Sequence, residues 1–331
     1  MQNFADWVQF SVSAAVVLLL LVLVILFLVL LLKRKKIGVA STDINIENLN
    51  KKWEEAAERL RMSTLTPDQL KVFLKEKKKK KKKDTPPTHD KSVFVLDFEG
   101  DIAASQCANL RDQITALIKI VQLNDEVVIR IESPGGMVQS YGLVASQVAR
   151  LRSRNIKVTA CVDKVAASGG YMMACVADKI VAAPFAIIGS IGVVAGLPNL
   201  NRFLKKHDID YIEQTAGESK RTISLFGELT EDKKNKQQQQ LNMIHSLFKK
   251  HVSQFRPSVN IDTVSTGEIW PASEALQLQL VDELATSDDL LLKYAETANV
   301  YLLSTEQPQD WKAKLMKKFM GHLSALYPSV S

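Results

Sequence analysis

Two glycine-rich turns carry the groups that a nucleophilic enzyme needs. The first lies in IESPGGMVQSYG, residues 131–142, and the second in AASGGYMMA, residues 166–174, where Ser168 directly precedes two glycines. Consecutive glycines let backbone amides approach a ligand closely. An oxyanion hole requires such an approach, because its N–H donors lie about 3 Å from the developing negative charge. The pattern therefore favours acyl transfer through a serine.

Each turn also has a purely structural interpretation. Pro134, Gly135 and Gly136 could form an ordinary turn between a strand and a helix, and Ser168 could cap the N-terminus of a helix. Taken singly, these are the commoner roles of such residues. The pair of turns favours a site, because adjacent parallel strands would bring Gly135 and Ser168 to the same edge of a sheet.

A serine nucleophile also needs a base. Histidine is the usual one, but no histidine of this chain adjoins a glycine pair; the five are His89, His207, His245, His251 and His322. A lysine can replace histidine where its pKa is lowered enough to leave the amine neutral. Lys220, in TAGESKRTISLFGELT, follows a strand-like segment and precedes an apolar stretch, although a solvated surface charge is the commoner role of a lone lysine.

The elements that must position these residues alternate between strand and helix. Apolar runs typical of strands buried on both faces occupy residues 92–98, 126–132, 156–162 and 179–184. Helical stretches are expected at about 105–121, 138–153, 168–177 and 230–256, with a short amphipathic helix in PASEALQLQLVDEL. This alternation predicts an α/β domain with largely parallel strands joined by crossover helices.

The N-terminal part has the composition of a membrane anchor. Residues 14–32 form an unbroken apolar run, about 28 Å long as a helix, which matches a bilayer core. The run is too long for a signal peptide, no basic residue precedes it and no small-x-small cleavage site follows it. We expect a retained transmembrane helix, and the basic KRKK at 33–36 places the C-terminal side in the cytoplasm.

Two further segments need an interpretation. Residues 37–90 are polar and end in a lysine run at 77–83, so we expect a tether with one helical stretch in 42–62. The lysine run could contact anionic lipid headgroups or serve as a solvated spacer. Residues 180–197 are apolar but interrupted by Pro184 and by glycines, so we expect buried strands and turns rather than a second membrane span.

Composition excludes several classes of protein. At 331 residues and 46% hydrophobic, the chain can bury a substantial core. Its net charge of +7 is concentrated in the two basic runs, without the interleaved arginines and aromatics of a nucleic-acid-binding surface, so no nucleic-acid partner is expected. Three cysteines in apolar surroundings do not form a disulfide framework. We expect no metal and no nucleotide cofactor.

Five motifs together resemble a known family. SPGG, ASGGYMMA, GSIGV, GESKRT and TGEIWPASEALQLQLVDEL occur in the order and spacing of the signal peptide peptidase A family of membrane serine peptidases. The resemblance covers nearly the whole chain and implies a ClpP/crotonase-like fold of repeated β-β-α units. It further implies that Ser168 is the nucleophile and Lys220 the general base, that Ser190 holds the lysine amine, and that the amides of Gly135 and Gly169 form the oxyanion hole.

The chain departs from the larger members of that family, which duplicate the fold, because it holds a single copy. In single-copy relatives the protomers form rings, and the lysine of one subunit completes the site beside the serine of its neighbour. The resemblance therefore implies a homo-oligomer.

These observations predict four segments and one activity. The segments are an anchor with its basic flank at 1–36, a lysine-rich linker at 37–90, a serine peptidase domain at 91–300 and a C-terminal extension at 301–331. We expect an endopeptidase of the bacterial inner membrane that cuts apolar peptides, such as signal peptides or membrane-protein fragments, through an acyl-enzyme. An acyl-CoA-binding crotonase-like protein and a non-catalytic membrane scaffold are the alternatives. The side of the membrane stays open, because well-known relatives hold this domain on the outer side.

Overall fold

The structure is a computed structural model that describes residues 44–81, 89–217 and 223–305. The predicted membrane helix at 14–32 lies outside these residues. No helix within the described ranges is both long and apolar enough to cross a bilayer.

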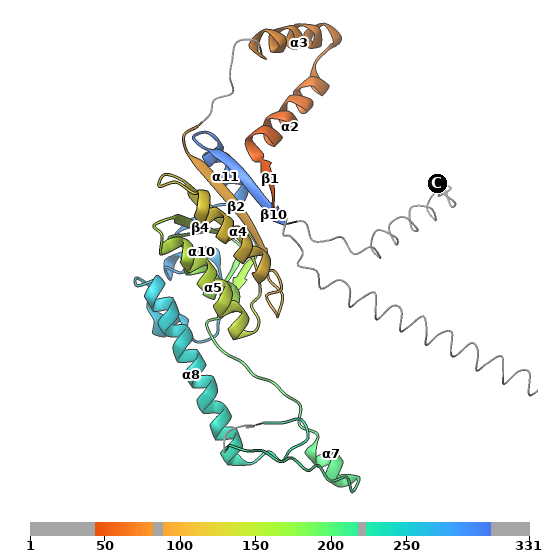
Figure 1. The fold of residues 1–331 in the computed structure, drawn as a ribbon, viewed down its shortest axis with the longest axis vertical. Coiled ribbons are helices and arrows are strands. Elements are labelled where there is room, and N and C mark those ends of the chain that lie inside the picture. The colour runs from red at the N-terminus through yellow and green to blue at the C-terminus, as the bar shows by residue number, and fades with distance from the viewer. Residues whose placement is uncertain (1–43, 82–88, 218–222, 306–331) are drawn as a thin grey trace, which may run out of the picture. The chain divides into compact units, whose positions relative to one another are not determined.

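The centre of the fold is a seven-stranded sheet (Figure 1). In sheet order its strands are β1 (Ile44–Asn48), β10 (Asn299–Thr305), β2 (Ser92–Glu99), β3 (Glu126–Glu132), β4 (Lys157–Val162), β6 (Lys179–Ala182) and β9 (Glu283–Leu284). Every neighbouring pair from β10 to β9 is parallel, and β1 pairs antiparallel with β10. The mixed α/β class predicted from the alternating pattern is thus confirmed.

The four predicted strands form because both faces of the sheet are covered. In β2, Val93 and Val95 face one apolar cluster, whereas Phe94, Leu96 and Phe98 face the other. A strand buried on both sides must be apolar at successive positions, which is the pattern that the sequence displays.

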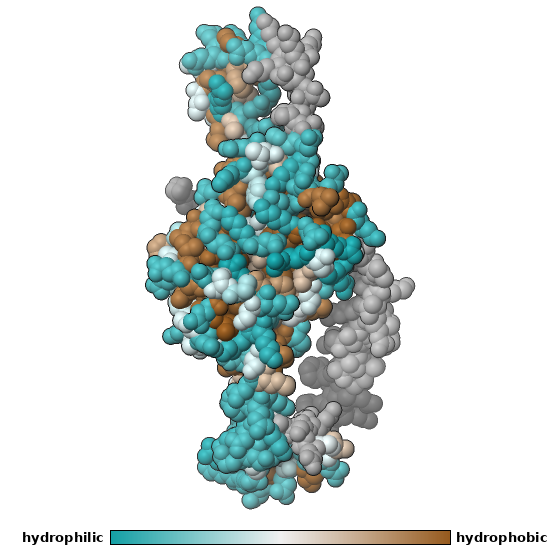
Figure 2. Space-filling view, turned by 90° about the vertical axis from the view of Figure 1, so that its left-hand side faces the viewer, coloured by the Kyte–Doolittle hydropathy of each residue, from teal (hydrophilic) through white to brown (hydrophobic). Residues whose placement is uncertain are grey.

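Ten helices lie within the described residues. They are α2 (Leu49–Thr64), α3 (Pro67–Lys81), α4 (Cys107–Ile120), α5 (Val138–Arg152), α6 (Gly169–Ala174), α7 (Asn201–Lys206), α8 (Glu231–Phe255), α9 (Ile261–Val264), α10 (Ala272–Gln277) and α11 (Ser287–Ala295). Helices α4, α5 and α6 contribute to the larger apolar cluster, and α11 to the smaller one on the other face. The space-filling view shows hydrophobic patches separated by hydrophilic residues over the middle of the molecule (Figure 2).

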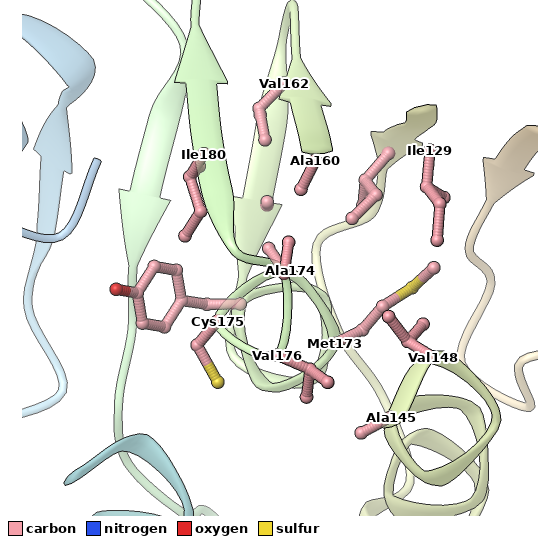
Figure 3. Packing of buried hydrophobic residues seen from close by; sticks show 14 of the residues in the cluster. Ile129, Ala145, Val148, Ala160, Val162, Met173, Ala174, Cys175, Val176 and Ile180 are labelled. Carbon is pink, nitrogen blue, oxygen red and sulfur yellow. The ribbon is translucent and has the colours of Figure 1, made fainter. Parts of the chain in front are cut away.

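Helix α6 is wedged into the larger cluster. Met173 lies between Ile129 of β3 and Val148 of α5, and Ala174 faces the strands (Figure 3). All residues of α6 are buried. The helix is shorter than the predicted 168–177, and it begins immediately after Ser168. The tight packing therefore fixes the turn that holds this serine.

A second, three-stranded sheet carries the site. Its strands are β5 (Val165–Ala167), β7 (Ile187–Gly189) and β8 (Ile269–Pro271). Strands β5 and β7 are parallel, and Ser133 forms an isolated bridge to Ala166. Residues 180–197 contain most of β6, all of β7 and no helix, which confirms the expected strands. The expected burial holds only in part, because Phe185 is 90% exposed and Val194 93%.

The segment expected to be a tether contains more regular structure than one helix. Residues 44–48 form β1 rather than helix, because each of them pairs with a residue of β10 at the edge of the sheet. Asn48 then caps α2 by accepting a hydrogen bond from Lys51 N. Leu49 is buried in the smaller cluster and Trp53 packs against it. The proposed domain boundaries at 90 and 300 stay predictions, but the sheet itself includes residues on both sides of them.

Between β7 and α8 the chain has a segment that we call the arm, residues 193–229, of which the structure describes 193–217 and 223–229. Within it, Asn199 Nδ2 donates to the carbonyls of Ser224 and Gly227, and Leu200 N donates to Leu225 O at 2.7 Å. These bonds join the part of the arm directly before α7 to the part at residues 224–227. Thr230 then caps α8, its side chain accepting from Lys233 N.

Candidate active site

Ser168 occupies a sharp turn between β5 and α6. Its backbone has φ 52° and ψ −117°, and its side chain makes no capping hydrogen bond. An ordinary N-cap has extended dihedrals and a side chain that accepts from the first turn, as Thr230 does with φ −88° and ψ 160°. Ser168 has neither property. The simple capping role considered from the sequence does not describe this residue.

The backbone at Ser168 is strained, and hydrogen bonds hold it in place. A non-glycine residue in such a region costs about 1–3 kcal/mol and persists only where its surroundings enforce it. Here Ser168 N donates to Gly189 O at 2.8 Å, and Ser168 O accepts from Met172 N at 2.9 Å. Many hydrolases present a nucleophilic serine on a strained strand-to-helix turn of this kind. The half-buried Ser168 hydroxyl has no hydrogen-bond partner among residues 44–81, 89–217 and 223–305, so it is available for reaction.

The structure brings the first glycine turn against this serine, as the sequence predicts. A Cβ placed on Gly135 would lie 2.7 Å from Ser168 Cβ and 2.8 Å from Gly169 N, so only glycine permits the approach. Gly135 also has φ +96°, which side chains disfavour. Gly169 N is the first amide of α6 and has no preceding helical carbonyl to bond.

The three amides of the first turn differ in their hydrogen bonds. Gly135 N donates to Ser133 Oγ at 3.1 Å, and Met137 N donates to Ile102 O at 2.9 Å. Gly136 N has no partner in the part of the chain that the structure describes, and Gly136 is half-buried. Two unbonded amides, those of Gly136 and Gly169, are therefore the ones that this arrangement leaves open to a ligand.

Ser190 lies beside Ser168 for a topological reason. In the parallel pairing of β5 with β7, Ala167 faces Gly189, so Ser168 and Ser190 are the next residues on neighbouring strands. Ser190 also has a positive φ, of 53°, and its N donates to Glu268 O at 2.6 Å. The structure thus groups four of the five predicted site residues, and Lys220 lies outside the described residues.

The histidines on α8 contact the site elements but not the serine. His251 Nε2 is 2.9 Å from Met172 O of α6, and His245 Nε2 is 3.3 Å from Ile191 O. Burial lowers the pKa of His251, although its bond to Met172 O opposes this. Both rings are already engaged with backbone carbonyls.

The cysteines are not alternative nucleophiles. Cys107, Cys161 and Cys175 are free, and the last two are buried. Burial raises the pKa of Cys161 to about 12, so its thiol stays protonated at neutral pH. Within the described residues, no group of three histidine, cysteine or carboxylate side chains is arranged to hold a metal ion.

Two buried residues beside the site carry no chemical signal in the sequence. Ser133 and Tyr141 form a hydrogen bond of 2.6 Å beneath the first glycine turn. Both occur in the quoted motif IESPGGMVQSYG, but no local periodicity marks them as a pair. Only the folded turn brings them together.

Comparison with known proteins identifies the family. Residues 150–301 match the peptidase family S49 and residues 2–148 match the peptidase family S49 N-terminal region. The chain is 47% identical to the probable protease SohB of Haemophilus influenzae, covering 86% of this chain and 82% of that protein. It is 43% identical to the probable protease SohB of Buchnera aphidicola subsp. Schlechtendalia chinensis, covering 76% and 86%.

Among solved structures, the 1510-N membrane-bound stomatin-specific protease in complex with a substrate peptide is similar at a TM-score of 0.44 and 18% identity, covering 69% of this chain and 97% of that one. The sequence matches extend over both the glycine turns and the segments that flank them. The chain belongs to peptidase family S49.

Proposed function

We propose that the protein is a membrane-anchored serine endopeptidase in which Ser168 is the nucleophile and Lys220 the general base. The observation that carries the proposal is the backbone of Ser168, which is held in a strained turn beside Gly135 and Gly169 with its hydroxyl unbonded within the described residues. An N-cap residue adopts ordinary extended dihedrals without strain. A nucleophilic serine benefits from the strained conformation, because the sharp turn presents its hydroxyl to a substrate.

In the proposed reaction, neutral Lys220 takes the hydroxyl proton while Ser168 Oγ attacks the carbonyl carbon of the scissile peptide bond. The carbonyl π electrons move onto the oxygen of the tetrahedral intermediate. Collapse of that intermediate breaks the C–N bond, and the lysine ammonium gives its proton to the leaving amine. Water then attacks the acyl-enzyme while Lys220 accepts a proton from it, and collapse of the second tetrahedral intermediate breaks the ester C–O bond. The lysine ammonium returns its proton to Ser168 Oγ, which frees the second product and regenerates Ser168 and neutral Lys220.

Backbone amides stabilise the tetrahedral oxygen in this scheme. The resemblance assigns Gly135 and Gly169, and both lie directly at Ser168. The role of Gly135 stays a prediction, and its amide is occupied by Ser133 Oγ here. We therefore propose that Gly169 N and Gly136 N donate, while Gly135 allows the close approach of the two turns.

Ser190 has a supporting role in this proposal. Its position beside Ser168 on the neighbouring strand would let its hydroxyl accept a hydrogen bond from the Lys220 amine. Such a bond would hold the amine near Ser168 Oγ.

Exposed apolar side chains at the first turn favour extended apolar substrates. Ile102 is 72% exposed and Met137 42%, and the two are joined through the bond from Met137 N to Ile102 O. Val138 is also exposed. Signal peptides and fragments of membrane proteins have matching sequences, and the apolar run at 14–32 would place the enzyme in the bacterial inner membrane, beside such peptides and its lipids.

The arm supports a homo-oligomer. It exposes apolar side chains that a soluble surface segment does not need: Val194, Leu197, Leu200, Phe203, Ile209, Tyr211 and Ile212. Val194 is 93% exposed and Ile212 82%. Exposed apolar segments of this kind mark protein interfaces. We propose that the arm packs on a neighbouring protomer and that Lys220, which lies within it, completes the site of that neighbour.

Intact-mass spectrometry of the detergent-solubilised full chain tests the proposal. A fluorophosphonate probe should add one phosphonyl group to the wild-type protein and none to Ser168→Ala or Lys220→Ala. Lys220→Arg should also remain unlabelled, because a guanidinium does not give up its proton in this pH range. Labelling that persists in Ser168→Ala, or equal labelling of Lys220→Arg and wild type, would contradict the mechanism.

A further inference from the structure

A chain of buried hydrogen bonds lies beneath the first glycine turn. Gly135 N is 3.1 Å from Ser133 Oγ, Ser133 Oγ is 2.6 Å from the hydroxyl of Tyr141, and that hydroxyl is 2.8 Å from the carbonyl oxygen of Asp101. Ser133 and Tyr141 are both 0% exposed. The chain therefore links the turn to the loop after β2 through two fully buried hydroxyl groups.

The acceptor at its far end fixes the direction of every bond. The Asp101 carbonyl can only accept, so the Tyr141 hydroxyl donates to it. The Tyr141 oxygen then accepts the proton of Ser133, and Ser133 Oγ accepts from Gly135 N–H. Burial raises the pKa of Tyr141, which keeps its phenol protonated and able to donate. The Gly135 amide consequently points toward the interior.

Three glycines, Gly100 and the adjacent pair Gly169 and Gly170, make room for these two side chains. A Cβ on Gly100 would overlap both Ser133 Oγ and the Tyr141 hydroxyl, and a Cβ on Gly169 would overlap the Tyr141 ring. A Cβ on Gly170 would lie 2.5 Å from Ser133 O. The fold thus keeps three positions without side chains around one serine and one tyrosine.

Ser133 also connects the two turns through its main chain. Its N donates to Val165 O at 2.8 Å and its O accepts from Ala167 N at 3.0 Å, which fixes β5 directly before Ser168. Its side chain meanwhile holds the Gly135 amide. One buried residue therefore sets the position of the serine strand and of the glycine turn relative to each other.

We propose that Ser133 and Tyr141 are positioning residues for the oxyanion hole. They hold the Gly135 amide inward, which fixes the turn in the conformation that leaves Gly136 N–H without a partner within the described residues. This inference rests on the proposed peptidase function, because it names the residues that prepare the same site. Neither side chain touches the substrate.

Steady-state kinetics on a fluorogenic apolar peptide, and the rate of fluorophosphonate labelling, test the proposal in the full-length oligomer. Loss of an oxyanion donor lowers kcat about 10²- to 10³-fold. Misorientation by Ser133→Ala or Tyr141→Phe should lower kcat by about 10- to 100-fold, with KM within about two-fold. The pH at which the activity reaches half of its maximum should stay the same, because neither substitution changes the proposed base Lys220.

Tyr171→Phe is the matched control. Tyr171 is equally buried, and its hydroxyl donates to a backbone carbonyl, Leu280 O at 3.0 Å, away from the glycine turn. It should lose a similar amount of stability in thermal unfolding but keep kcat. Equal losses of kcat in Tyr141→Phe and Tyr171→Phe would reduce the role of Tyr141 to general stability and overturn the proposal. An increase in kcat for Ser133→Ala would mean that Ser133 competes for a catalytic amide, which also overturns it.

Hydrogen exchange measured by mass spectrometry separates this inference from the proposed function. Peptides that contain Gly135 should exchange faster in Ser133→Ala and Tyr141→Phe than in wild type, and at the wild-type rate in Tyr171→Phe. If these changes appear while the wild-type protein takes no label at Ser168, the hydrogen-bond chain stands and the peptidase proposal fails. Unchanged exchange in both variants would refute the chain, whatever the activity.

Discussion

At the scale of single residues, the site depends on positions where no side chain fits. Gly135 lets the first turn touch Ser168, and Gly169 leaves space for the ring of Tyr141. Ser168 itself carries backbone strain that its neighbours enforce through hydrogen bonds to Gly189 and Met172. The lack of room for a Cβ at Gly169 and Gly170 explains why two glycines follow Ser168 in this turn.

Gly169→Ala should destabilise the protein and abolish labelling of Ser168. The new methyl group would overlap the fully buried ring of Tyr141, and overpacking of this kind costs about 1–3 kcal/mol. Gly142→Ala in α5 is the control, because nothing lies within 4 Å of its added Cβ. Alanine in a helix interior should raise stability there by about 0.5–1 kcal/mol and leave labelling intact. Thermal unfolding with parallel probe labelling measures both, and normal labelling of Gly169→Ala would contradict this account of the site.

At the scale of secondary-structure elements, α8 packs against the elements that form the site. Its buried residues Phe248 and Val252 belong to the larger apolar cluster. Its two histidines contact α6 and the residue after Ser190 through backbone carbonyls. Helix α8 therefore contacts the segments that follow Ser168 and Ser190.

The burial of His251 should make the stability of the protein depend on pH. Burial lowers the pKa of His251 below its usual 6.5, so the folded protein holds the ring neutral. The unfolded chain takes up a proton first as pH falls, and the stability present above about pH 6.5 should decline toward the lowered folded pKa. His251→Gln keeps an N–H donor for Met172 O but does not titrate. The thermal unfolding midpoint should therefore drop further between pH 7.5 and pH 5.5 in the wild-type protein than in this variant. An equal drop in both proteins would exclude His251 as the cause.

The strand β1 and the start of α2 are part of the folded unit, and the side chain of Asn50 connects them to α11 and β10. Asn50 Nδ2 donates to the carbonyls of Ala295 and Ala298, and its Oδ1 accepts from Val300 N at 2.7 Å. Asn50→Ala should cost about 1–3 kcal/mol, because it leaves backbone groups without partners. Asn45→Ala, at an exposed position of β1, should be nearly neutral. Equal stability of the two variants, measured by thermal unfolding, would contradict an anchoring role for Asn50.

At the scale of the whole molecule, the single copy of the fold and the apolar arm both lead us to expect a homo-oligomer. A protomer that exposes Phe203 and Ile212 in the segment that carries Lys220 would benefit from a neighbour that covers them. Burial of these side chains on the next subunit would deliver the base and stabilise the assembly at once.

Mixing two inactive variants tests shared sites between subunits. Ser168→Ala and Lys220→Ala should each be inactive alone. When both are coexpressed, mixed oligomers would contain some sites with an intact serine from one subunit and an intact lysine from the next, so labelling should return. Oligomers of a Ser168→Ala/Lys220→Ala double variant mixed with Lys220→Ala are the matched control and should remain unlabelled. No recovery in mixed oligomers that are shown to form would place both residues in one subunit.

Local patterns in the sequence determined much of the fold. Strands β2, β3, β4 and β6 were predictable because burial on both faces demands continuous apolar runs. The glycine pairs and Ser168 were visible as candidates, because such turns need small residues. The roles proposed for Ser190 and Lys220 rest on the family resemblance, since neither residue has a local signal stronger than that of an ordinary serine or lysine.

Tertiary structure decided what depends on residues distant in the chain. It placed residues 44–48 at the edge of the sheet, where pairing with β10 outweighs the helical pattern that follows. It put Ser168 in a strained conformation that no sequence window encodes. It packed Ser133 and Tyr141 into the space that the absence of side chains at Gly100 and Gly169 leaves. Periodicity reports which face of an element is buried, whereas the partners of a buried hydroxyl are set by the packing of several elements at once.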